Sequence, residues 1–171
     1  MSDPQDNLNS HSSHLIQRAE ANLQRELDWV GRCDARIAFV AGISIAMLGV
    51  LANSSANIID WDLFLYIVFG VTGFLLIGSL VSLYFAQYPK TDSFNSSLIY
   101  FGTIAERRLD QFQKEFKSLS DENYLDDLLC QTHTNAQILE KKFRLLKISL
   151  SMIIISVAPW LMAIYYSKLY F

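Results

Sequence analysis

Three long runs without a charged residue constrain what this chain can fold into more than any other feature of its sequence. They cover residues 37–52, 63–86 and 148–166, and they contain none of the 14 Lys and Arg or the 17 Asp and Glu residues. An α-helix rises about 1.5 Å per residue, so about 20 apolar residues cross the hydrocarbon core of a bilayer. We therefore predict an all-α membrane protein with three transmembrane helices. This pattern excludes a soluble globular domain, a secreted disulfide scaffold and a nucleic-acid binder of the strongly basic kind, so we expect no nucleic acid among the partners.

The limits of the three spans follow from the lengths of these runs. The first run is short, so it either extends to Ile59, giving a span over 37–59, or thins the bilayer. The other spans are expected at 63–86 and 148–166. Pro159 removes one helix hydrogen bond and predicts a kink or a locally satisfied break. A two-span alternative, with the last run lying on the membrane surface, is disfavoured because that run has no polar stripe.

The orientation follows from the basic residues. The loop 53–62 holds Asp60 and Asp62 but no Lys or Arg. Basic residues precede the first and third spans, at Arg25, Arg32, Arg36, Lys141, Lys142, Arg144 and Lys147. By the positive-inside rule, we expect the N-terminus and segment 87–147 to be cytoplasmic and the loop to lie outside.

The charged parts of the chain predict a cytosolic helical bundle. After a polar tail over 1–13, Ile16, Leu23 and Val30 are spaced by seven and predict a helix over 14–36 that continues into the first span. The same spacing over 96–119 predicts one further amphipathic helix. A third helix begins after Ser120 or Asp121, which are N-cap candidates, and runs into the third span. Segment 87–147 is thus a helical hairpin, and the bundle combines it with extensions of helices 1 and 3.

Small residues recur at intervals of four in the first span, and at multiples of four in the second, where Phe74 fills the gap, as they do where helices pack closely in membranes. The first span carries Ala38, Gly42 and Ala46, and the second carries Gly70, Gly78, Ser82 and Ala86. Both packing within one protomer and packing between protomers remain open.

Asp34 is the sharpest local feature, because it interrupts the apolar seam of the first helix. A buried carboxylate needs a partner, which Arg107, Arg108, Lys142 or Arg144 can supply. These cations and Arg36 are also candidates for binding an anionic ligand, since guanidinium groups suit phosphate. Gln131 and His133 are further candidates, although His133 is equally explained by an interhelical hydrogen bond. Trp29, Tyr100 and Phe101 are candidates for stacking on a base, although aromatics at helical spacing are more often core.

No motif for catalysis or metal binding occurs in the sequence, so we expect neither an enzyme nor a metal site. Cys33 and Cys130 have no metal-ligand spacing.

Four short motifs carry a resemblance to a known family. In chain order they are Trp29-Val-Gly-Arg-Cys-Asp34-Ala-Arg36, Leu98-Ile-Tyr-Phe101-Gly102-Thr-Ile104-Ala105, Asp127-Leu128-x-x-Gln131 and Lys142-Phe143-x-x-Leu146. Over about residues 15–166 the chain resembles the transmembrane effector family of bacterial Pycsar anti-phage systems. The family pattern before the first span is Asp-x-Lys-Ala. In this chain Asp34 is followed by Arg36 at the Lys position and by Ile37 at the Ala position. The chain is more distantly similar to the two-span effectors of CBASS-type (SLATT-type) signalling.

The resemblance implies an effector in the bacterial inner membrane that needs no cofactor. It would respond to cyclic UMP or cyclic CMP from a partner cyclase, impair the membrane and cause abortive infection. With no cyclic-nucleotide-binding β-roll in the sequence, the pocket would lie between helices or between protomers, and we expect a homo-oligomer. The alternative is a membrane-anchored coiled-coil protein that docks a soluble partner.

Overall fold

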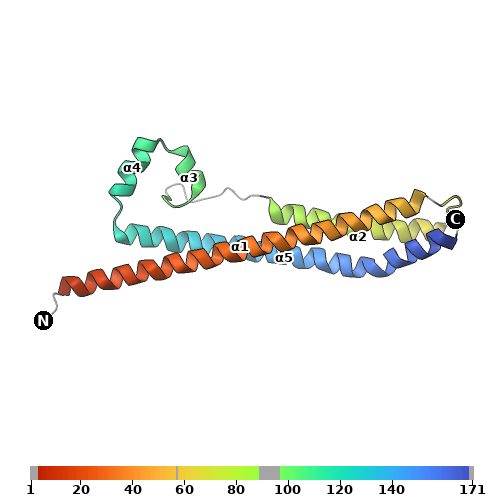
Figure 1. Ribbon diagram of the computed structural model, residues 1–171, viewed down its shortest axis with the longest axis horizontal. Helices are drawn as coiled ribbons and strands as arrows, with labels where there is room; N and C mark the ends of the chain where they lie inside the picture. The colour runs from red at the N-terminus through yellow and green to blue at the C-terminus, as the bar shows by residue number, and fades with distance from the viewer. Residues whose placement is uncertain (1–3, 57, 89–96, 170–171) are drawn as a thin grey trace. The chain divides into compact units, whose positions relative to one another are not determined.

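The computed structural model describes residues 4–56, 58–88 and 97–169, and the side chains of 11–56, 58–88 and 97–168. These residues form five helices and no strand, which confirms the all-α prediction (Figure 1). The helices are α1 (Pro4–Ala56), α2 (Leu63–Gln87), α3 (Phe101–Glu106), α4 (Leu109–Lys117) and α5 (Asp121–Leu169).

The chain divides into two compact units, and the two longest helices contribute to both. Unit 1 contains α1 up to Gly31, α3, α4 and α5 up to Glu140. Unit 2 contains the rest of α1, all of α2, and α5 from Lys141.

Three helices, α1, α2 and α5, are long and apolar enough to cross a membrane, as the uncharged runs predicted. Each contains an 18-residue window with a mean hydropathy of 2.0 to 2.3. α2 matches the predicted span within one residue, and its first turn is capped by Asp62, whose Oδ1 accepts a 2.7 Å hydrogen bond from the Leu65 amide.

The boundaries of α1 differ from those expected. The segment 1–13, predicted as a polar tail, is helical from Pro4, a residue suited to the first position of a helix. At its other end α1 stops at Ala56, short of Ile59. The Ser55 hydroxyl donates to the Ala52 carbonyl oxygen and the Ile58 amide donates to that of Ser55, so local bonds replace the helical ones.

The prediction of a single amphipathic helix over 96–119 is wrong, because the structure has two shorter helices there, α3 and α4. Arg107 and Arg108 separate them in extended backbone conformations, with ψ angles of 149° and 148°. The Arg107 side chain binds the backbone at Ser97 and Thr103 and so fixes this bend. α5 begins as predicted: the Ser120 hydroxyl accepts from the Asn123 amide at 3.3 Å. α5 remains helical through Pro159.

Unit 2 has a hydroxyl-rich centre in which its three helices meet. Ser44 of α1, Ser79 of α2 and Ser149 of α5 are each fully buried. The Ser79 hydroxyl lies 3.1 Å from that of Ser44 and 2.6 Å from that of Ser149, so one serine joins all three helices. Nearer the other end, Trp160 Nε1 of α5 donates a 3.0 Å hydrogen bond to the Met47 carbonyl of α1.

The two small-residue patterns have different roles in the protomer. On α2, Ala86 is buried and a Cβ at Gly78 would lie 3.2 Å from Met152 Sδ of α5, so this part of the pattern packs within the chain, whereas Gly70 is exposed. On α1, Ala38, Gly42 and Ala46 are exposed, and apart from the nearby backbone of its own helix no described atom lies within 4 Å of a Cβ built at Gly42.

Unit 1 has a small apolar core between α1 and α5. Ala19, Leu23 and Leu128 are buried, and Ile16, Ile99, Tyr124 and Leu125 pack against them. The Tyr124 hydroxyl donates a 2.9 Å hydrogen bond to Glu20 Oε1, which fixes the register of the two helices. Ile99 brings the segment before α3 into this core.

Candidate functional site

Asp34 pairs with Lys142, one of the four partners expected for it. Lys142 Nζ lies 2.5 Å from Asp34 Oδ1 and 3.5 Å from Gln87 Oε1, and all three residues belong to unit 2. The side chains are 13% (Lys142) and 36% (Asp34) exposed, so water still reaches the carboxylate. The pair therefore links α1 and α5 without the high desolvation cost of a fully buried ion pair.

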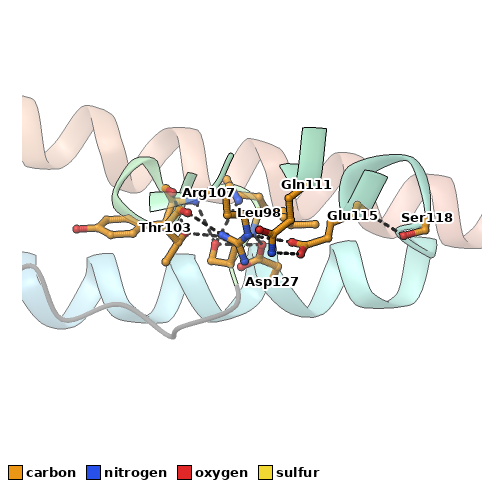
Figure 2. Close-up of polar contacts among 10 residues, drawn as sticks. Leu98, Thr103, Arg107, Gln111, Glu115, Ser118 and Asp127 are labelled. Atoms are coloured by element: carbon orange, nitrogen blue, oxygen red, sulfur yellow. Dashed lines mark hydrogen bonds and ion pairs between the residues drawn. The ribbon is translucent and has the colours of Figure 1, made fainter. Parts of the chain in front are cut away.

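Arg107 is engaged by its own unit. Its Nη1 donates to the carbonyl oxygens of Ser97, at 3.0 Å, and Thr103, at 2.8 Å, and its Nε donates to Glu115 Oε2 at 2.9 Å (Figure 2). Only 13% of the side chain is exposed. The hydrogen bond from Gln111, together with Arg107, lowers the pKa of the Glu115 carboxyl. Arg107 thus connects the residues before α3 to α4.

Asp127 of α5 holds the start of the same segment, which we call the aromatic turn (Ser97–Phe101). Its Oδ2 accepts hydrogen bonds from the Leu98 amide at 2.8 Å and the Ser97 hydroxyl at 3.1 Å. The Ser97 hydroxyl in turn accepts from the amides of Ile99 and Tyr100, so one carboxylate and one hydroxyl satisfy three successive amides.

The aromatic turn forms one wall of a cavity of about 250 Å³ in unit 1. Leu23 and Leu27 of α1 form the second wall, and Gln131 and Asn135 of α5 the third. The residues from the turn are Ile99, Tyr100 and Phe101. Gln131 is buried, and the rings of Tyr100 and Phe101 lie 4.7 Å apart and are tilted. An apolar hollow with two amide side chains at one wall suits a flat, polar-edged ring.

A second, larger hollow of about 630 Å³ lies between α3, α4 and the start of α5. Arg107, Thr103 and Gln111 line it, but so do Glu106 and Glu115. Two carboxylates beside one engaged guanidinium make this hollow unfavourable for a phosphate group.

The remaining candidates from the sequence do not line this cavity. Arg36 and Arg144 are exposed in unit 2. Arg108 is exposed and lies 3.4 Å from Asp110. His133 is exposed and its Nε2 lies 3.0 Å from Gln137 Nε2 on the same helix, so among the described residues its hydrogen bond is intrahelical, not the interhelical one considered for it. Trp29 is 45% exposed on α1.

The structure therefore brings together three of the sequence candidates, Tyr100, Phe101 and Gln131, at one cavity. Sequence analysis missed the residues that build the site: Ser97, Thr103, Glu115, Asp127 and Asn135. Asp127 had a signal, because it opens the motif Asp127-Leu128-x-x-Gln131 and lies one helical turn before Gln131. The described residues contain no group of three His, Cys, Asp or Glu that could hold a metal ion.

Fold and site define a class: an all-helical protein whose three apolar helices can span a membrane, with a second unit that carries a small cavity lined by aromatic and amide side chains. Residues 18–167 match the family described as Pycsar effector protein domain. The chain belongs to this family, which confirms the resemblance seen in its motifs. It is also similar to the Pycsar effector protein GmPycTM of Gulbenkiania mobilis, with 24% identity over 166 residues, covering 78% of this chain and 83% of that protein. No solved structure matches the chain.

Proposed function

We propose that this chain is an anti-phage effector that binds a cyclic pyrimidine mononucleotide, cyclic UMP or cyclic CMP, and then impairs the bacterial inner membrane. The observation that carries the proposal is the family match over residues 18–167, which includes the apolar helices and the unit with the cavity. A partner cyclase would supply the nucleotide on infection, and membrane damage would halt the infected cell. The chain would act by binding alone, without a catalytic step or a cofactor.

The proposed site for the base is the cavity between the aromatic turn, α1 and α5. Its volume of about 250 Å³ is below the ~300–1,000 Å³ typical of pockets for whole drug-sized ligands, so it suits one ring rather than an entire nucleotide. Gln131 and Asn135 carry amide groups that can pair with the polar edge of a pyrimidine, and Tyr100 and Phe101 offer ring faces. The sugar and the cyclic phosphate would remain outside the cavity.

The route from this site to the membrane would be the two long helices. α1 and α5 line the cavity and each continues without interruption into unit 2. A ligand that binds one arrangement of α1 and α5 better than another shifts the population of that arrangement. We expect the N-terminus and segment 87–147 to face the cytoplasm, where the messenger is made.

We further propose that the effector is a homo-oligomer that uses the outward face of α1. Ala38, Gly42 and Ala46 lie there at intervals of four, and in the protomer all three are exposed. Small residues let two helices approach closely in lipid, where apolar area alone does not drive helices together.

A docking protein is the second candidate function, and α4 favours it. None of its nine residues, all of which the structure describes, is buried. Leu109 is 71% exposed and Phe116 is 52% exposed on the apolar side of this helix. A membrane-anchored protein with a soluble partner would cover such a face. Recovery of one stoichiometric soluble protein, with no effect of nucleotides on the melting temperature, would favour this candidate.

The proposal is tested by dye leakage from liposomes that contain the purified full-length protein. We expect leakage with cyclic UMP or cyclic CMP and none with cyclic AMP or cyclic GMP. Protein-free liposomes with each nucleotide are the control for leakage that the ligand causes directly. Absence of leakage with every cyclic nucleotide contradicts the proposal.

The cavity is tested separately with Gln131→Leu, a substitution of similar size that removes the amide. We expect it to weaken nucleotide binding by about tenfold, the order of one lost hydrogen bond to a buried polar group. Gln137→Leu, at an exposed position of the same helix, is the matched control. Unchanged nucleotide affinity in Gln131→Leu would show that the nucleotide binds outside this cavity.

A further inference from the structure

The sequence suggests Arg107 as a ligand for an anion, but its hydrogen bonds point to a different role. Nη1 is shared between the carbonyl oxygens of Ser97 and Thr103, and Nε is held by the carboxylate of Glu115. A guanidinium that binds phosphate presents its paired N–H groups to the ligand. Here Nη1 contacts the backbone before and within α3, and Nε contacts Glu115 of α4. Little of the side chain reaches solvent.

Asp127 acts on the same segment from the opposite side. It accepts from the Leu98 amide and the Ser97 hydroxyl, while Arg107 binds the Ser97 carbonyl. Thr103 adds a 2.6 Å hydrogen bond from its hydroxyl to that same carbonyl oxygen. Ser97 is thus held at its side chain and its carbonyl by residues of α3, α5 and the bend before α4.

These bonds determine where Tyr100 and Phe101 lie. The Tyr100 amide donates to the Ser97 hydroxyl at 3.0 Å, and its carbonyl accepts from the Ile104 amide in the first turn of α3. Moving Ser97 therefore moves the wall of the cavity. Phe101 is 74% exposed and Tyr100 is only half-buried, so apolar packing alone holds this wall weakly.

We propose that Arg107 and Asp127 are positioning residues that hold the aromatic turn as the ligand-facing wall of the cavity and do not themselves contact the nucleotide. This inference rests on the proposed function, because it assigns these residues a role in the same site. Arg107 binds the two main-chain carbonyls through Nη1 and the Glu115 carboxylate through Nε, and a lysine ammonium has no second nitrogen to make both kinds of contact. Glu115 keeps the guanidinium in that orientation.

The first test uses no nucleotide: hydrogen–deuterium exchange of the intact protein, followed at residues 98–104. We expect Arg107→Lys and Asp127→Ala to speed exchange there by about tenfold, since each loses about one net hydrogen bond of protection. The matched controls are Arg108→Lys and Asp126→Ala, neighbouring exposed residues with the same charges. Exchange at 98–104 as slow as in the wild type in both variants overturns the proposal.

The second test separates positioning from direct contact, by isothermal titration with cyclic UMP and cyclic CMP. If Arg107 bound the phosphate, Glu115→Gln would release it and tighten binding, and Arg107→Lys would keep most of the affinity because the charge remains. A positioning role predicts the reverse: Glu115→Gln binds equally or more weakly, and Arg107→Lys binds about tenfold more weakly. Tighter binding in Glu115→Gln overturns the proposal.

Together, the two tests distinguish failure of the positioning role from failure of the proposed function. If the wild type binds no cyclic nucleotide but exchange quickens in the variants, the proposed function fails while the positioning of the turn stands. If the wild type binds nucleotide and Arg107→Lys binds it equally well, the function stands and the positioning role is wrong.

Discussion

The hydroxyl oxygens of Ser79 and Ser149 lie 2.6 Å apart, and both side chains are fully buried between α1, α2 and α5. Ser44 completes the group at 3.1 Å from Ser79. No water competes for these hydroxyls in a bilayer, so they join the three helices that are able to span it.

Ser79→Ala removes both interhelical hydrogen bonds at once and should destabilise unit 2 by about 1 kcal/mol, since such bonds in membranes average about 0.6 kcal/mol each. The measurement is the midpoint of unfolding of the detergent-solubilised protein. Ser151→Ala is the control, because Ser151 is exposed and bonds only to the Lys147 carbonyl of its own helix. Equal midpoints for the two variants would show that the triad contributes nothing.

Asp34→Ala should leave Lys142 largely buried without its carboxylate and destabilise the protein by about 1–2 kcal/mol, between the values for exposed and buried ion pairs. On the proposed function, toxicity on co-expression with a pyrimidine cyclase should fall in parallel. Thermal unfolding and growth curves measure the two effects. Lys141→Ala, at the exposed neighbouring position, should behave as the wild type. Full stability and full toxicity of Asp34→Ala would make the pair incidental.

Gly42→Leu should weaken self-association and leave the protomer intact, because a Cβ at this position meets no described atom beyond the nearby backbone of α1. Crosslinking in membranes and analytical ultracentrifugation in detergent report the oligomeric state, and the melting temperature reports the protomer. Gly70→Leu on α2 is the matched control, since its Cβ likewise meets no described atom beyond the nearby backbone of its own helix. An unchanged oligomeric state in Gly42→Leu would show that this face of α1 is not the oligomer interface.

Acid should loosen the bend between α3 and α4. The hydrogen bond from Gln111 and then Arg107 lower the pKa of Glu115 below its ordinary value of 4.5, so its stabilising contribution is complete above that value. The contribution is lost as the pH falls through the lowered pKa. Amide exchange in α4, corrected for the intrinsic pH dependence, measures this. Glu115→Gln should lack the transition, and an identical acid profile in that variant would exclude Glu115 as its source.

The three long apolar helices were predictable because a bilayer imposes a one-dimensional condition, enough consecutive residues without charge. The runs 37–52, 63–86 and 148–166 come close to that condition, and the structure has helices there that are long and apolar enough to cross a membrane. The start of α5 was predictable for a similar reason, since an N-cap such as Ser120 acts within one turn. The end of α1 at Ala56 was less predictable, because the local bonds of Ser55 compete with weakly apolar neighbours.

The segment 96–119 shows where such reasoning ends. Its heptad spacing favours one helix, but Arg107 gains two carbonyl partners and Glu115 when the chain bends there. Those partners lie up to ten residues away in sequence, and no local pattern encodes their meeting. The Lys142 partner of Asp34 is a comparable case: the need for a cation was evident, but the choice among four depended on how α1 and α5 pack.

The sequence by itself determined the three apolar helices, the charged helical segments outside them and the family, because hydropathy and short motifs are properties of consecutive residues. Only the tertiary structure decided which residues meet. It placed Tyr100 and Phe101 with Gln131 at one cavity, engaged Arg107 within its own unit, and left the face of Gly42 exposed. These outcomes depend on hydrogen bonds and packing between residues far apart in the chain, where each side chain has several possible partners and the fold selects one.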